Sequence, residues 1–180
     1  MRIIAGTARG RRLESPSGWG TRPTLDRVRE NLFNILMPRV AGAVFLDLFA
    51  GTGANGLEAL SRGAARAVFA ESDAAVLAVL RKNIALCGFE DRAVVSRAIL
   101  PAGLAALAGP FDLIFADPPY AWGDHAALLE AGSAPGLVRE GALFVLETAR
   151  KTAPPEAAGR WTRYRRAEYG DTALNFYQAT

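Results

Sequence analysis

The chain has 180 residues, of which 51% are hydrophobic and 22% charged, and this composition excludes a disordered protein and predicts one globular domain over residues 1–180. A single cysteine, Cys87, and a single histidine, His125, exclude a disulfide framework and a thiolate zinc site, and no metal is implied. No apolar run has the length of a membrane span and the N-terminus has no signal-peptide apolar region, which predicts a cytoplasmic protein.

The net charge of +3 conceals two basic flanks. Residues 1–29 hold seven arginines against two acidic residues, and residues 150–166 hold six basic residues against one. Such flanks favour a polyanionic partner, and arginine suits phosphates and guanine edges. Trp19, Trp161 and Tyr164 lie among these arginines, and aromatic rings can stack on unpaired bases. A solvated face and a GC-rich genome remain the alternative explanations.

In chain order, two short β-like segments at residues 2–5 and 11–14 come first, within a basic extension of residues 1–23. They are separated by glycines and predict a small hairpin. A helix follows, with Thr24 as a candidate N-cap and apolar residues at helical spacing, and we expect Pro38 to end it.

From residue 43 onward, short apolar runs alternate with helical stretches, a pattern typical of strands buried on both faces of a parallel sheet. We expect strands at residues 44–48, 67–71, 94–96, 111–116 and 142–147. We expect helices at residues 54–62, 73–87, 102–107 and 124–131. Residues 161–169 and 173–178 predict an antiparallel hairpin at the sheet edge. The predicted fold is therefore α/β, with a mostly parallel, doubly wound sheet as the catalytic core over residues 24–180.

A glycine loop joins the first predicted strand to the next helix, in the sequence VFLDLFAGTGANG of residues 44–56. Gly51, Gly53 and Gly56 let the backbone turn sharply and let a ligand approach closely. Glu71 ends the next strand, 20 residues after Gly51, where a carboxylate can accept both hydroxyls of a ribose. This spacing fits a dinucleotide fingerprint and indicates a nucleoside-binding fold without identifying the cofactor.

Asp47 distinguishes between the possible cofactors, because it stands at the carboxyl end of the first strand beside the loop. A pyrophosphate is bound by the N–H groups of a helix N-terminus and would be repelled by this carboxylate. S-adenosylmethionine carries no phosphate, and its ammonium and sulfonium groups are attracted to a carboxylate. Asp47 and Glu71 therefore predict S-adenosylmethionine. The alternative is that Asp47 only accepts backbone N–H bonds and caps the loop.

A second motif, Asp117-Pro118-Pro119-Tyr120, follows the fourth predicted strand. Two prolines stiffen this loop at the carboxyl end of a strand, where open α/β sheets bind ligands. Tyr120 is suited to stacking on a planar base, while the Asp117 carboxylate and the Pro118 carbonyl accept the hydrogens of an exocyclic amine. A proline-stiffened turn with a surface aspartate is the alternative.

With both motifs considered, the sequence resembles the bacterial RsmD family, the 16S ribosomal RNA guanine(966)-N2 methyltransferases. Residues 117–120 resemble the (Asn/Asp/Ser)-Pro-Pro-(Tyr/Phe) signature of amino-methyltransferases, and residues 47–53 resemble their cofactor loop. The most specific likeness lies near the N-terminus, in residues 2–6, 10–11, 22–24, 26–30 and 32–34. The resemblance covers nearly the whole chain.

The resemblance implies a Rossmann-like class I S-adenosylmethionine-dependent methyltransferase. It would methylate the exocyclic N2 of a guanine in 16S ribosomal RNA, within the small ribosomal subunit or an assembly intermediate. The residues expected at the cofactor are Asp47, Phe49, Gly51, Gly53, Glu71, Thr24 and Arg27. Those expected at the target base are Asp117, Pro118, Pro119 and Tyr120. RNA contacts are expected at Arg9, Arg11, Arg12, Arg22 and Arg29. The chain has Ser96-Arg97-Ala98 where many methyltransferases offer a polar side chain to the adenine, so backbone groups are expected to make that contact.

The expected reaction is an in-line methyl transfer, with Asp117 as a hydrogen-bond acceptor that can also take the departing proton. A DNA adenine-N6 methyltransferase is one alternative, although such enzymes usually add a target-recognition domain for which 180 residues leave no room. A protein glutamine methyltransferase is another. An NAD-dependent oxidoreductase or a plain nucleotide-binding module is disfavoured by Asp47 and by the lack of an evident catalytic acid–base group.

Overall fold

The computed structural model describes residues 1–16, 23–119 and 121–180, with the backbone alone for residues 23–25. The chain divides into two compact units, Met1–Arg97 and Ala98–Thr180. The single domain expected from the composition stays a prediction. In the described part of the chain, no helix is long and apolar enough to cross a membrane.

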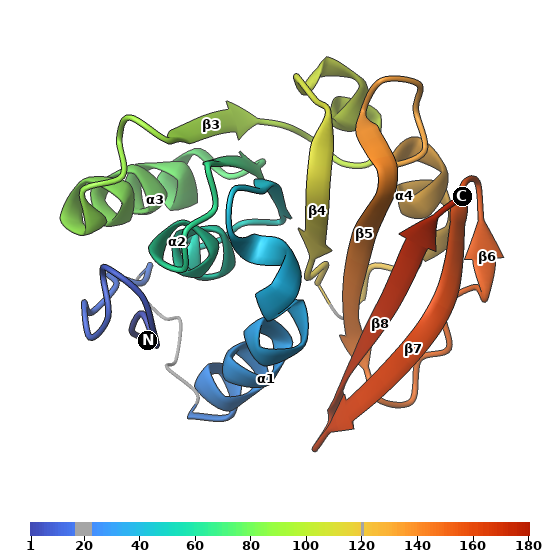
Figure 1. Cartoon of the computed structure of the whole chain (residues 1–180), viewed down its shortest axis with the longest axis horizontal. Coiled ribbons are helices and arrows are strands. Elements are labelled where there is room, and N and C mark those ends of the chain that lie inside the picture. Colours follow the sequence, from blue (N-terminus) through green and yellow to red (C-terminus); the bar gives the residue numbers. More distant parts are fainter. Residues whose placement is uncertain (17–22, 120) are drawn as a thin grey trace. The chain divides into compact units, whose positions relative to one another are not determined.

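The first unit is a parallel sheet with helices packed on it (Figure 1). Its strands are β1 (Val44–Leu48), β2 (Arg66–Glu71) and β3 (Ala93–Arg97), paired in the order β3-β2-β1. Its helices are α1 (Pro23–Val40), α2 (Ala54–Ser61) and α3 (Ala74–Cys87). Helix α2 contacts β1 and β2, α3 contacts β2 and β3, and α1 packs on α2. Nearly every residue of β1 and β2 is buried, which agrees with the predicted burial of these strands on both faces.

Helix α1 does not end at Pro38, as the sequence predicted, but continues to Val40. A proline so close to a helix end removes only one hydrogen-bond donor, which the last turn tolerates.

The N-terminal segment is an irregular loop with one antiparallel bridge, between Arg2 and Arg12, in place of the two predicted strands. The backbone N–H groups of Ile4 and Ala5 donate instead to the carboxylate of Glu58 on α2, at 2.8 and 3.0 Å. Within the first unit, side chains such as Glu58 therefore hold this segment where the sequence predicted a β-ladder.

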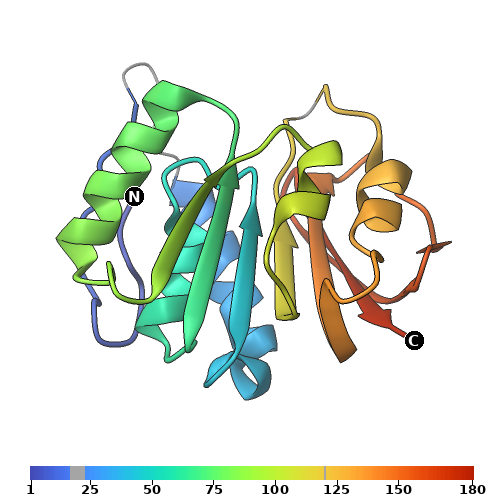
Figure 2. The same ribbon diagram turned by 90° about the horizontal axis from the view of Figure 1, so that it is seen from above.

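The second unit contains the parallel pair β4 (Phe111–Ala116) and β5 (Val138–Ala149), followed by antiparallel strands. These are β8 (Thr172–Ala179), β7 (Trp161–Tyr169) and β6 (Ala157–Ala158), in that spatial order. Figure 2 shows the helices η1 (Ala102–Ala106) and α4 (His125–Ala131) side by side on one face of these strands. The predicted α/β class, mostly parallel with an antiparallel edge hairpin, is confirmed.

Two features of the second unit differ from the predictions. Strand β5 begins before the predicted residue 142, because its start pairs with Phe111 on β4 ahead of an irregularity in register.

Trp161, expected among RNA-binding residues, has no exposed surface and packs edge-on against Phe144 with ring centroids 5.4 Å apart. It belongs to the core and cannot stack on a base, whereas Tyr164 is 52% exposed. Trp19 lies outside the described residues.

Candidate active site

The glycine loop leaves β1 through a left-handed backbone. Phe49 has a φ of 57°, a value that non-glycine residues rarely adopt, and Gly51 and Gly53 follow with φ of 55° and 81°. A Cβ added to Gly53 would lie 2.3 Å from the side chain of Leu80 on α3, so close packing requires glycine here. Backbone strain of this kind clusters at ligand sites, where the surrounding structure maintains it.

Asp47 holds this loop against the start of α2. It is 1% exposed, and its Oδ2 accepts the backbone N–H of Gly56 at 2.8 Å. The capping role that the sequence left open is therefore present in the structure. Gly56 packs tightly as well, since a Cβ there would lie 2.2 Å from the ring of Phe69. A direct contact between Asp47 and the cofactor stays a prediction.

Glu71 supports the same loop from the end of β2. Its Oε2 accepts the N–H of Gly51 at 3.0 Å, and its Oε1 accepts the N–H groups of Ser72 and Asp73 at 2.8 and 3.1 Å. A carboxylate has about four acceptor positions, so a ribose hydroxyl would share or replace some of these bonds. The position of Glu71 beside Gly51 is consistent with its predicted role at the ribose.

Replacing Glu71 with Ala is expected to weaken S-adenosylmethionine binding by about 1–3 kcal/mol, because the variant has no charge-assisted acceptor at this position. Isothermal titration calorimetry measures this change directly. The exposed Glu90, replaced by Ala, is the matched control and should bind as the wild type does. If both Glu71→Ala and Asp47→Ala bound the cofactor normally, the assignment of this loop would be wrong.

Asn83 is a supporting residue that the sequence analysis missed. It is fully buried on α3, where its Oδ1 accepts the N–H of Glu14 at 2.8 Å. Its Nδ2 donates to the carbonyls of Glu14 and Thr52, at 3.0 and 2.9 Å. The N-terminal segment and the glycine loop are thereby joined through one side chain. An asparagine in the middle of an apolar helix was the available signal.

The predicted RNA-binding arginines are in different environments. Arg9, Arg11 and Arg12 are exposed, and Arg11 also donates to the carbonyl of Leu86. Arg22 lies outside the described residues. Because the side chains of Arg9, Arg11 and Arg12 are exposed, they can reach a phosphate group in solution.

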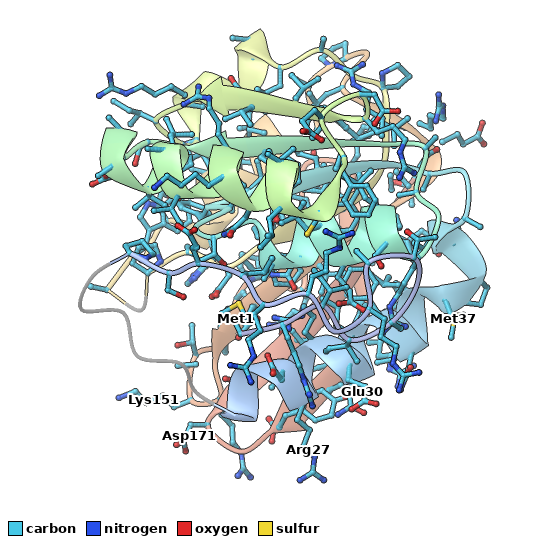
Figure 3. All side chains as sticks on the ribbon, turned by 90° about the vertical axis from the view of Figure 1, so that its left-hand side faces the viewer. Met1, Arg27, Glu30, Met37, Lys151 and Asp171 are labelled. Atoms are coloured by element: carbon cyan, nitrogen blue, oxygen red, sulfur yellow. The ribbon has the colours of Figure 1, made fainter. Side chains whose placement is uncertain are left out.

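Arg29, in contrast, is only 4% exposed. It pairs with Asp26 at 2.9 Å and donates to the carbonyl of Arg2 at 2.6 Å. The RNA contact predicted for Arg29 is therefore wrong, since its guanidinium is used to hold the N-terminal segment on α1. Arg27, expected near the cofactor, is exposed and projects away from α1 in Figure 3. The side chain of Thr24 lies outside the described residues.

The Asp-Pro-Pro motif begins directly after β4. Pro118 is buried, and the carbonyl of Pro119 accepts the N–H of Trp122 at 2.7 Å, which closes a turn. Tyr120 lies outside the described residues. Asp117 is open to solvent on one side, yet protein surrounds it on the others, and this burial raises its pKa to about 6.

Glu147 is a second residue that the sequence analysis missed. It follows Leu146 on β5, and Leu146 pairs with Ala116, the residue before Asp117 on β4. Burial, and then the negative charge of Asp117, raise the pKa of Glu147 well above its usual value. Paired carboxyls with raised pKa values are typical of functional sites. The signal in the sequence was an acidic residue at the end of an apolar run.

The fold and these two loops define a class of protein, the Rossmann-like methyltransferases. The family model described as "Conserved hypothetical protein 95" matches residues 1–178. Ribosomal RNA small subunit methyltransferase D of Escherichia coli K12 is 39% identical over 178 residues, which cover 99% of this chain and 89% of the relative. The Haemophilus influenzae protein of the same name is 36% identical over 181 residues, covering 99% and 93%.

A solved structure, the Escherichia coli protein yhhF, superposes with a TM-score of 0.87 at 39% identity, and covers 99% of this chain and 97% of its own. The chain belongs to the family of ribosomal RNA small subunit methyltransferase D. The family resemblance found in the sequence is thereby confirmed.

Proposed function

We propose that this protein transfers a methyl group from S-adenosylmethionine to the exocyclic N2 of a guanine in 16S ribosomal RNA. The proposed site of action is the cytoplasm, on the small ribosomal subunit or an assembly intermediate. The observation that carries the proposal is the Asp117-Pro118-Pro119 loop after β4, in a chain 39% identical over 99% of its length to a ribosomal RNA methyltransferase.

The glycine loop suits S-adenosylmethionine better than a dinucleotide. Asp47 and Glu71 both accept backbone N–H groups at this loop, so the N–H donors that would bind a pyrophosphate are already used by carboxylates. The same negative charges favour a cationic ligand. Phe49, Gly51 and Gly53 are proposed to line its methionine end. When bound, S-adenosylmethionine supplies the electrophilic methyl group.

The Asp-Pro-Pro loop is proposed to hold the target amine. Guanine N2 is a weak nucleophile because its lone pair is delocalised into the ring. Acceptors at Asp117 and at the Pro118 carbonyl would bond its two hydrogens and return electron density to nitrogen. With a pKa of about 6, Asp117 is ionised at neutral pH and is a stronger base than an ordinary aspartate, so it can also take the departing proton. Tyr120 is proposed to stack on the base.

The exposed arginines of the N-terminal segment are proposed to bind RNA phosphates. Replacing Arg9, Arg11 and Arg12 with Gln should lower RNA affinity and reduce the slope of log K against log salt by roughly 0.7–0.9 for each phosphate that is no longer neutralised. Cofactor affinity should change little. The control is Arg139→Gln on β5, an exposed arginine paired with Asp112. An unchanged salt slope would assign the three arginines to a solvated face.

The proposed function is tested by incubating the protein with labelled S-adenosylmethionine and small ribosomal subunits that lack the modification. Mapping the labelled nucleotide should identify a single guanine, and hydrolysis should yield N2-methylguanosine. Label in DNA or in ribosomal protein would contradict the proposal. Thermal unfolding with S-adenosylmethionine and with NAD separates the cofactors, because only the true ligand stabilises the fold by mass action.

A further inference from the structure

We propose that Glu147 recognises the target base as guanine by accepting its N1–H, while Asp117 accepts a hydrogen of the N2 amine. The inference rests on the proposed function and deepens it. The Asp-Pro-Pro loop accounts for binding an exocyclic amine, and Glu147 would account for the choice of guanine over other bases that carry such an amine.

The geometry comes from the register of β4 and β5. After the irregularity near Phe111, the strands pair without a break, ending with Ala116 beside Leu146. The next residue along the chain is a carboxylic acid in both cases, Asp117 directly after β4 and Glu147 on β5. Paired residues of parallel strands project to the same face, with strands about 4.8 Å apart. The two acids therefore emerge together at the carboxyl end of the strands.

Among the described residues, no basic group offsets the charge of Glu147. Asp117, directly after β4, is the charged group that raises the pKa of Glu147, and the residue paired with Glu147 on β8 is the apolar Leu174. In the part of the chain that the structure describes, neither acid accepts a hydrogen bond from another residue. Protein surrounds much of both carboxyls without donating to them, so a ligand that brings N–H donors to this position would form hydrogen bonds that the protein itself leaves open.

Guanine is the base whose edge fits two adjacent acceptors. It presents N1–H and N2–H donors side by side, whereas adenine presents a bare N1 beside its amine. The N1–H of guanine would pair with the ionised Glu147 and, as a hydrogen-bond donor, would favour that ionised form in the complex, whereas adenine N1 offers a lone pair and no donor. Sites that hydrogen-bond a substrate group reject analogues lacking that group, because the buried acceptor is then left unpaired.

The test compares guanine with 2-aminopurine, which keeps the N2 amine and has no N1–H, at the target position of otherwise identical small subunits. In single-turnover assays we expect the wild type to prefer guanine by at least about a hundredfold. Glu147→Gln should lose about tenfold or more of this preference, because its amide can donate to the bare N1. Glu140→Gln, an exposed site on the same strand, should leave both rates unchanged.

The outcomes separate this inference from the proposed function. Equal losses on both bases, or no loss, in Glu147→Gln would overturn the role of Glu147 while guanine methylation by the wild type stands. No transfer to guanine by the wild type would overturn the proposed function and this inference with it. Asp117→Asn, which acts on the amine common to both bases, should slow both reactions by similar factors.

Thermal unfolding supplies a readout that a merely structural role would not give. The pKa of Glu147 is raised in the folded state, so its contribution to stability is lost as pH rises from the ordinary value of 4.5 through the raised value. Glu147→Gln removes this titration. It should melt at a higher temperature than the wild type near about pH 8 and at a similar temperature near about pH 4. A lower melting temperature at both pH values would make Glu147 a packing residue and overturn the proposal.

Discussion

Replacing Asp117 with Ala is expected to slow methyl transfer about a hundredfold, the usual cost of losing one well-placed transition-state hydrogen bond. The alanine variant leaves one hydrogen of the target amine unpaired. The rate should be measured in a single turnover at saturating RNA and cofactor, because this isolates the chemical step from product release. Asp112→Asn at the start of the same strand is the matched control, and its rate should equal that of the wild type.

Asp117→Asn should lie between Ala and the wild type, since it keeps an acceptor oxygen of similar reach and loses the charge. The wild-type rate should also fall as pH drops through about 6, where Asp117 takes up a proton, and this decline should be absent in the asparagine variant. If Asn and Ala were equally inactive while both bound RNA and cofactor, Asp117 would have to contribute its charge, and a role as acceptor alone would be wrong.

Replacing Glu58 with Ala is expected to lower the free energy of unfolding by about 3–5 kcal/mol, the cost of breaking a buried ion pair from one side. Glu58 has no exposed surface and pairs with Arg62 at 2.7 Å and with Arg29 at 3.8 Å. It also accepts the backbone N–H groups of Ile4 and Ala5. Without this carboxylate, the largely buried guanidinium of Arg62 loses its ion pair, and two N–H groups lose their acceptor.

Urea unfolding measures the decrease in stability, and limited proteolysis shows whether the N-terminal segment detaches first. Glu58→Gln keeps an acceptor oxygen and should be destabilised less than the alanine variant. Glu30→Ala, an exposed change on α1 (Figure 3), should lie within about 0.5 kcal/mol of the wild type. A decrease below about 1 kcal/mol in Glu58→Ala would show that water or other groups replace the carboxylate at Arg62 and at the two N–H groups, and it would contradict this account.

The strands that carry the motifs were predicted closely. β1 and β4 have the predicted bounds, because a strand buried on both faces leaves a short and mostly apolar run in the sequence. The start of β5 was missed, since residues 138–141 include charged side chains and become a strand only by pairing with β4. The N-terminal segment has one bridge in place of the two predicted strands, because Glu58 accepts the N–H groups of Ile4 and Ala5 that a longer β-ladder would have used.

The glycine loop, Glu71 and the Asp117 motif could be located from the amino-acid sequence, because these groups stand at strand ends and strand ends are visible in local apolar patterns. That Arg29 is a buried anchor could be recognised only in the folded chain, since it is one of seven arginines that look alike in residues 1–29. The pairing of Glu147 with Asp117 also required the fold. Burial and pairing depend on contacts between segments far apart in the chain, and the free energy of a charge depends on those contacts rather than on its neighbours in sequence.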